Sequence, residues 1–340
     1  MTRRRLPVWL ALGGAVLIGV LTALQARING QLGVRLDDGF AAAVVSFGSG
    51  LVILLALSAL LPSGRRGFAT LVTEVRGRRI PFWMLCGGAA GALTVATQGL
   101  AVGIIGVSLF TVGVVAGQAV CGLVIDRIGY GPAGIVAVTL GRVGGAALAL
   151  VAVGVSLTGS GVHDVPAWML VLPVLAGAGI AWQQATNGRL RQRVGTPLTA
   201  TLVNFIGGTL LLAIAAAVHI AIDGPPAAFP TDPWLYLGGA TGVVYIMLSA
   251  GLVAHTGVLL MGLASVVGQL SMSLILDLTW PAPASPGLAQ ELIMVAIAMA
   301  SVVVATARRR RGQAGMRERS GRASSALRRP PPERSGLPPT

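Results

Sequence analysis

The residues of this chain that could do chemistry are side-chain amides at matched positions in two parts of the sequence. Gln25 and Asn29 are four residues apart, and Gln183 and Asn187 repeat that spacing 158 residues later. Residues at i and i+4 share one face of a helix. A buried amide in hydrocarbon lacks water partners, so it turns toward another helix or a wet cavity. These four residues are candidates for a substrate pathway, and hydrogen bonding between helices is the alternative.

Two further glutamines and two aspartates occupy matched positions in later apolar runs. Gln118 and Gln269 lie near the middle of their runs, and we predict that they line a cavity, with a clamp on a backbone carbonyl as the alternative. Asp126 and Asp277 follow eight residues later and end the same runs. A proton relay needs a carboxylate shielded from water, so for these run-end positions we favour gate or capping contacts.

The sequence holds no constellation typical of an enzyme or a metal site. No carboxylate pair, no nucleophile beside a base and no metal-ligand spacing occurs among its residues. Cys86 and Cys121 sit inside apolar runs as small hydrophobic residues. We therefore expect neither enzymatic activity nor a cofactor.

Composition shows which elements must position the amides. The chain has 340 residues, of which 54% are hydrophobic and 11% charged, and its mean hydropathy is +0.80. The apolar residues form runs long enough to cross about 30 Å of hydrocarbon. Residues 1–26 resemble a secretory signal, but the long first run favours a first helix. We predict ten transmembrane helices, over residues 7–25, 39–61, 81–102, 105–125, 136–156, 165–185, 198–220, 233–253, 257–277 and 287–306.

An internal repeat divides these runs into two halves of five. Residues 25–50 match residues 183–208 at nine of 26 positions, and residues 83–126 match residues 234–277 at 14 of 44. Because each half has an odd number of crossings, the second half must enter the membrane from the opposite side. We therefore predict an all-α membrane protein of two inverted five-helix repeats, residues 1–158 and 159–306.

The arginines test this topology. With both termini in the cytoplasm, 22 of the 25 basic residues fall on the inside, Arg27 and Arg35 on the outside, and Arg142 within a helix. The net charge of +14 therefore follows membrane topology, and it forms no stripe that would indicate nucleic-acid binding. Residues 307–340, with ten Arg and five Pro, predict a disordered basic cytoplasmic tail that is attracted to anionic lipid.

The repeat motifs carry a family resemblance. Gln25 to Gly30 and Gln183 to Gly188, with Gly117-Gln118 before Asp126 and Gly268-Gln269 before Asp277, resemble the YdcZ-like branch of the drug/metabolite transporter superfamily. The resemblance covers residues 7 to about 306 and implies an EamA-like fold with a central cavity between the halves. The chain departs from the pattern where Asp37, Asp38 and Gly39 stand in place of Gly195, Thr196 and Pro197.

The expected function is that of a secondary transporter of the cell membrane. Its expected partners are an unidentified small polar metabolite and the lipid bilayer, with no nucleic acid. Since no helix centre carries an acidic residue for proton-coupled exchange of cationic drugs, a neutral or weakly charged substrate fits better. A non-transporting membrane scaffold or regulator is the alternative function. The oligomeric state is open, with a homodimer as one option.

Overall fold

The computed structural model describes residues 7–156, 165–283, 287–301 and 303–305. The first half comprises α1 (Val8–Leu36), α2 (Gly39–Leu60), α3 (Pro62–Arg76), a 3-10 turn (Phe82–Leu85), α4 (Gly87–Thr97), a π-helical turn (Gln98–Val102), α5 (Gly103–Ile128) and α6 (Leu140–Ser156). The second half comprises α7 (Ala167–Val194), α8 (Pro197–Asp223), a 3-10 turn (Pro233–Tyr236), α9 (Gly238–Thr256), α10 (Val258–Thr279) and a last helical segment, Leu288–Ala305. The described residues contain no strand, and the predicted tail lies outside them.

Among the described residues, eight helical segments are long and apolar enough to cross a membrane, which confirms a multi-pass membrane protein. One of the eight, Phe82–Ile128, is 47 residues long, more than twice the length that a single crossing requires. Gly106 interrupts it with φ 81° and ψ 166°, a backbone conformation that favours glycine. A ninth apolar helix, Leu140–Ala152, is shorter than the others. Ten crossings would therefore require that Phe82–Ile128 cross twice and that the shorter helix Leu140–Ala152 also cross.

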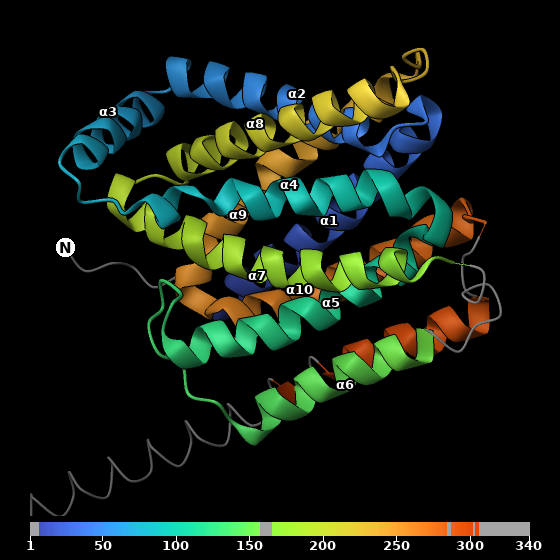
Figure 1. Ribbon diagram of the computed structural model, residues 1–340. Helices are drawn as coiled ribbons and strands as arrows, with labels where there is room; N and C mark the ends of the chain where they lie inside the picture. The colour runs from blue at the N-terminus through green and yellow to red at the C-terminus, as the bar shows by residue number, and fades with distance from the viewer. Residues whose placement is uncertain (1–6, 157–164, 284–286, 302, 306–340) are drawn as a thin grey trace, which may run out of the picture.

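The two halves are interleaved (Figure 1). In the picture α7 lies between α4 and α5, and the contacts between elements agree, because α7 packs against both. In the same way α1 packs against α9 and α10. The first helix of each half, α1 or α7, therefore lies between two helices of the other half, α9 and α10 or α4 and α5. Neither half has a separate core.

Two phenylalanines related by the repeat meet where the halves join. Phe47 of α2 and Phe205 of α8 stack with ring centroids 4.7 Å apart, and both are buried. Each ring lies against the glycine that follows the other phenylalanine by three residues: Phe47 against Gly208, and Phe205 against Gly50. Glycine is needed at both places, because a Cβ atom would overlap the facing ring. The exchange of contacts marks a pseudo-twofold axis through this pair.

Gly50→Val should destabilise the protein, while Gly48→Val, two residues earlier in the same helix, should be tolerated. A Cβ atom at Gly50 would collide with the Phe205 ring, whereas nothing lies within 4 Å of one at Gly48. Overpacking of this kind costs about 1–3 kcal/mol. Thermal unfolding of the purified variants in detergent measures the difference, and equal melting temperatures for the two variants would contradict the packing at the axis.

The predicted boundaries of the first helix in each half were wrong. α1 continues to Leu36 and α7 to Val194, well past the predicted ends at residues 25 and 185. The added turns are rich in polar residues, which lowers the hydropathy, but they stay helical because they pack inside the protein. Asp37 and Gly195 then both adopt the left-handed conformation at the helix end. Asp38 and Thr196 both cap the next helix, so the departure from the family pattern leaves the turn geometry unchanged.

Candidate functional site

Side-chain amides meet at two places that the repeat relates. In the first, Gln25 Nε2 donates to the Gly238 carbonyl (2.9 Å), and Asn29 Nδ2 donates to Gln98 Oε1 (2.7 Å). Gly238 and Gly242 of α9 let these amides approach, because a Cβ atom on either glycine would overlap them. We name this set, Gln25, Asn29, Gln98 and Ser46, the first amide group.

The second amide group consists of Gln183, Asn187 and Asn204. Gln183 Nε2 and Asn187 Nδ2 both donate to Asn204 Oδ1, each at 3.0 Å. Here Gly87 and Gly91 of α4 make the room, and they are the repeat equivalents of Gly238 and Gly242. Asn204 stands at the position that Ser46 holds in the first half. Each group therefore joins side chains of the first two helices of one half, α1 and α2 or α7 and α8, to glycines of α9 or α4 in the other half, and Gln98 of the π-helical turn completes the first group.

The aromatic pair lies between the two amide groups. Phe47 contacts the same face of Gly91 as Gln183, and Phe205 contacts the same face of Gly242 as Gln25. The structure thus places Gln25 and Asn29 in one group and Gln183 and Asn187 in the other, with the stacked rings between the two groups. We name the two amide groups and the Phe47–Phe205 pair together the amide seam.

The amide groups keep unused hydrogen-bonding capacity. Four amide atoms in them have no hydrogen-bond partner among the described residues although they are buried, namely Gln25 Oε1, Asn29 Oδ1, Gln98 Nε2 and Asn204 Nδ2, and the Ser46 hydroxyl has none either. A buried polar group without a partner costs about 1–3 kcal/mol. Such atoms are expected where water or a ligand supplies the missing partner.

Gln118 and Gln269 lie outside the amide groups. Both side chains are 2% exposed. Both amide atoms of Gln118, and Oε1 of Gln269, have no hydrogen-bond partner among the described residues. Each follows a glycine at a close helix crossing, Gly117 against the Val174 carbonyl of α7 and Gly268 against the Val16 carbonyl of α1. Among the described residues, no backbone carbonyl accepts a hydrogen bond from the amide of Gln118.

Asp277 and Asp126 cap helices of the opposite half. Asp277 accepts hydrogen bonds from the Val107 N–H (3.1 Å) and the Ser108 N–H (2.7 Å), which the break at Gly106 frees. Asp126 accepts from the Val258 N–H (3.1 Å), directly after Gly257 with φ 75° and ψ 166°. Both carboxylates are buried, and an N-terminal carboxylate also stabilises a helix through its dipole.

Two arginines, Arg142 partly buried and Arg27 buried, were not predicted as site residues. The Arg142 guanidinium of α6 forms an ion pair with Asp126 and donates to the Ala137 carbonyl (3.1 Å). Arg27, predicted in an outside loop, lies within α1 and is 3% exposed. Its nearest described partner ring is Trp280, 5.5 Å from the guanidinium carbon. Asp126 and Arg142 are 16 positions apart and lie on different helices, so the sequence carried no signal for that pair.

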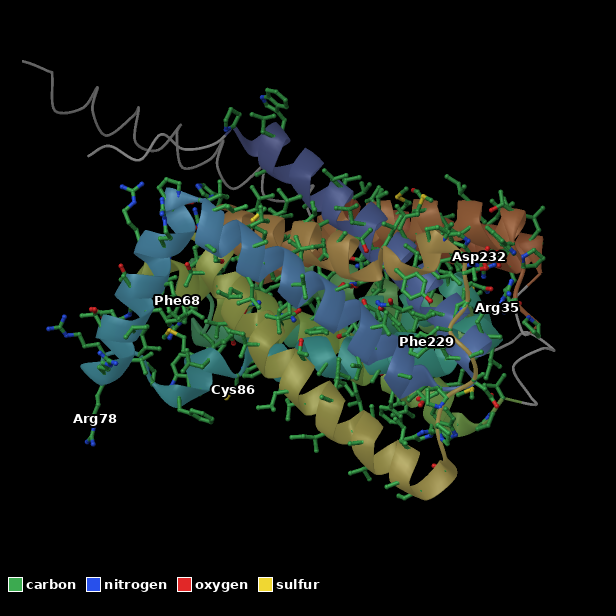
Figure 2. The ribbon with its side chains drawn as sticks, turned by 90° about the horizontal axis from the view of Figure 1, so that it is seen from above. Arg35, Phe68, Arg78, Cys86, Phe229 and Asp232 are labelled. Atoms are coloured by element: carbon green, nitrogen blue, oxygen red, sulfur yellow. The ribbon has the colours of Figure 1, made fainter. Side chains whose placement is uncertain are left out.

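Arginine and aromatic side chains cover both ends of the bundle. Figure 2 labels Arg35 and Asp232 at one end and Arg78 and Cys86 at the other, and we name these the Arg35 end and the Arg78 end. At the Arg78 end, Arg189 lies 5.9 Å from the Trp83 ring and 5.2 Å from the Tyr130 ring. At the Arg35 end, Trp234, the repeat equivalent of Trp83, lies 5.5 Å from Trp280.

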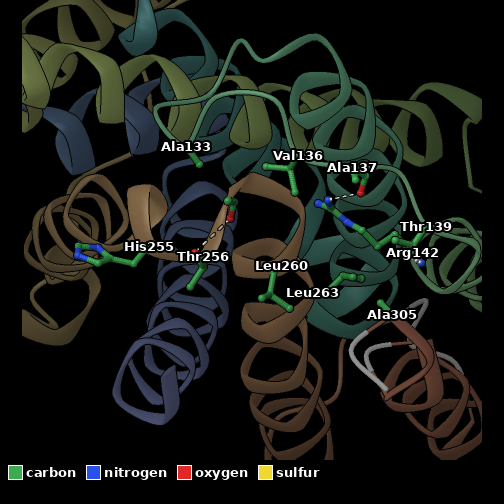
Figure 3. A pocket seen from close by; sticks show the side chains of 11 residues that line it. Ala133, Val136, Ala137, Thr139, Arg142, His255, Thr256, Leu260, Leu263 and Ala305 are labelled. Carbon is green, nitrogen blue, oxygen red and sulfur yellow. Dashed lines mark hydrogen bonds between the residues drawn. The ribbon is translucent and has the colours of Figure 1, made fainter. Parts of the chain in front are cut away.

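A cavity of about 280 Å³ lies between the segment that follows α5, the end of α9 and the start of α10 (Figure 3). Arg142, His255, Thr256, Leu260 and Leu263 are among its lining residues, and no amide of the seam lines it. The cavity is mostly apolar. Within the described residues no cluster of three or more metal-ligating side chains occurs.

Comparison with known proteins gives a family and a fold. The family described as "Putative inner membrane exporter, YdcZ" matches residues 10–155 and, a second time, residues 168–307. A solved crystal structure aligns with 88% of this chain and 98% of its own chain, with a TM-score of 0.53 and 16% sequence identity, which supports the fold alone. No curated protein sequence matches the chain.

Proposed function

The chain belongs to the YdcZ family of the drug/metabolite transporter superfamily, and on that premise we propose that it is a secondary carrier of a small polar metabolite. The family description names export across the inner membrane, and we take that direction for this chain. The double family match over two halves agrees with the internal repeat. An enzymatic role has no support among the described side chains.

The observation that carries the proposal is the amide seam between the halves. Inverted-repeat carriers bind substrate near the bilayer midplane, where their repeats meet. The seam combines pseudo-twofold symmetry with four buried amide atoms that lack partners. A carrier needs such atoms because its substrate, on entry, must exchange hydrogen bonds with water for hydrogen bonds with the protein. On exit the substrate must give up these hydrogen bonds again.

We propose ten crossings, with both termini in the cytoplasm and the Arg78 end facing it. In this topology the segment Phe82–Ile128 makes two crossings that divide at Gly106, and α6 makes one. The Arg78 end carries α3, with its arginines, and the end of α7, with Arg189, Arg191 and Arg193. The excess of arginine on this side supports its cytoplasmic orientation.

Alternating access would part the arginine and aromatic side chains at one end at a time. At the Arg78 end, Arg189, Trp83 and Tyr130 would separate, and at the Arg35 end Arg27, Trp234 and Trp280 would do so. Asp126 and Asp277 would hold the broken helices in place as these gates move. The close glycine crossings of α1 with α10, and of α7 with α5, offer smooth surfaces for a rocking motion.

The side chains of the seam favour a neutral or weakly charged substrate that both donates and accepts hydrogen bonds. Amides offer donors and acceptors but no net charge, and no carboxylate belongs to either amide group. To test the function, liposomes with the purified protein are loaded with a polar metabolite extract, and the compounds that leave are identified by mass spectrometry. Efflux equal to that of protein-free liposomes for every compound would contradict the proposal.

Gln118→Leu and Gln269→Leu should reduce efflux of the identified metabolite at least about tenfold, the change that 1.4 kcal/mol of lost transition-state binding produces. This loss is expected because we propose that both residues line the substrate pathway. Because buried atoms without partners, both amide atoms of Gln118 and Oε1 of Gln269, are removed, thermal stability should be unchanged or raised. Unchanged efflux in both variants would remove these residues from the pathway and favour a scaffold role. Gln192→Leu, at an exposed amide, is the matched control.

A further inference from the structure

One face of α3 is buried against α2 and against the opposite half of the protein. Gly64, Gly67 and Leu71, spaced i, i+3 and i+7, are its buried residues. Gly67 packs against Thr196 and Thr199 at the start of α8, and Leu71 belongs to a buried cluster with Leu190 and Val194 of α7. These contacts fix the rotation of α3 about its axis, so the direction of every other side chain on it follows.

Beside the buried face, α3 exposes large apolar side chains. Phe68 is 47% exposed and Val75 is 39% exposed. At about 100° per residue, both lie between the buried face and the line of Arg65 and Arg76. Figure 2 shows the helix at the edge of the bundle, with Phe68 and Arg78 labelled on it and just after it. An apolar strip bordered by arginines is the pattern of a helix that lies in a membrane interface.

The charge of this segment is strongly positive. Between Pro62 and Arg79 there are five arginines and one glutamate, a net charge of +4. Glu74 is paired with Arg79 at 3.2 Å, where the Arg79 side chain is 70% exposed. Arg65, Arg66, Arg76 and Arg78 form no ion pair within the described residues. Phosphate groups of lipids match the geometry of guanidinium groups.

The direction of α3 places this strip at a membrane surface. In Figure 2 α3 runs across the Arg78 end, transverse to α2, and so lies roughly in the membrane plane if the bundle axes cross the membrane. We propose that α3 is an in-plane helix that binds the anionic phospholipid headgroups of the inner leaflet, with Phe68 and Val75 among the acyl chains. This rests on the proposed topology, which puts the Arg78 end in the cytoplasm.

Lipid binding to α3 would also affect the side chains that close the Arg78 end, Arg189, Trp83 and Tyr130. Leu71 and Leu190 share one cluster, and Arg189, the residue before Leu190, covers Trp83 and Tyr130. A headgroup that holds α3 against the membrane therefore also holds the end of α7. Anionic lipid is thus expected to stabilise the closed inner end.

The charge is tested by thermal unfolding of the full-length protein in detergent with added phosphatidylglycerol or phosphatidylcholine. Phosphatidylglycerol should raise the melting temperature more than phosphatidylcholine, and R65Q/R66Q/R76Q should lose at least half of that difference. The matched control, R308Q/R309Q/R310Q, removes the same charge from the tail and should keep it, because anionic lipid bound to a tail predicted to be disordered does not stabilise the folded helices. Soluble glycerol phosphate should give no shift, since it lacks the acyl chains. An undiminished lipid effect in the α3 variant, or an equal effect of glycerol phosphate, would overturn the proposal.

The placement is tested by spin labels in liposomes, on a C86A/C121A background. A label at F68C should be accessible to oxygen dissolved in the lipid, and one at T70C, on the opposite face, to a water-soluble nickel reagent. A water-accessible label at both positions would overturn the proposal, and a soluble partner would then be the occupant to seek. Both readouts are independent of transport, so a protein that moved no metabolite could still pass them.

Discussion

Replacing Asp126 by alanine should destabilise the protein by about 3–5 kcal/mol, the cost of leaving a buried ion pair with one partner. The carboxylate is 1% exposed, pairs with Arg142 and accepts the Val258 N–H at the start of α10. Alanine would leave the Arg142 guanidinium, whose side chain is 11% exposed, without its counter-charge. It would also remove the cap of α10. Reversible unfolding of the purified protein in mixed micelles measures the change.

Two further variants test where this cost comes from. Asp126→Ala combined with Arg142→Met should recover part of the loss, because no buried charge is then left alone. Glu74→Ala breaks an exposed pair with Arg79, and it should cost less than about 1 kcal/mol. A cost for Asp126→Ala as small as that for Glu74→Ala would show that Asp126 neither caps α10 nor balances Arg142.

Asn204→Leu should abolish most transport, with a reduction of more than about tenfold in efflux, which corresponds to at least 1.4 kcal/mol. Asn204 Oδ1 accepts hydrogen bonds from both Gln183 and Asn187, so leucine leaves the side-chain NH₂ donors of these two buried residues without their acceptor. Each unpaired donor costs about 1–3 kcal/mol. The reoriented amides would no longer present their free atoms to a substrate.

Asn204→Ser is the matched control, because serine is the residue at the equivalent position, Ser46, in the first half. The hydroxyl keeps an acceptor in the second amide group, so efflux should fall by less than in the leucine variant. Efflux of the identified metabolite from proteoliposomes compares the two. Wild-type efflux in Asn204→Leu would place the substrate pathway away from the second amide group.

The sequence predicted the parts of the fold that depend on hydrophobicity and on the repeat. Apolar runs located the membrane helices, and the family resemblance is confirmed by the family match. Hydropathy failed where helices continue as polar segments inside the protein, as in residues 26–36 of α1. It also missed α3, although Gly64, Gly67 and Leu71 are spaced as one helical face.

The candidate site was predictable only in its symmetry. Matching positions paired Gln25 with Gln183 and Asp126 with Asp277, but they did not reveal which helix each side chain faces. The interleaving of α1 with α9 and α10 decides this, since it sets amides of one half against glycines of the other. Gly106 and Gly257 also occupy matched positions of the repeat, and they mark the helix breaks that the aspartates cap. The helix breaks could have been predicted from these two glycines.

The central claim is that two copies of one unit cross the membrane in opposite senses. Cysteine placed at Arg35 or at Arg193, on a C86A/C121A background, can be labelled in intact cells by a reagent that does not cross the inner membrane. These positions are repeat equivalents, near the ends of α1 and α7. We expect label at position 35 before lysis and at position 193 only after the membrane is opened. Equal labelling of both positions from one face would contradict the inverted architecture and the carrier built on it.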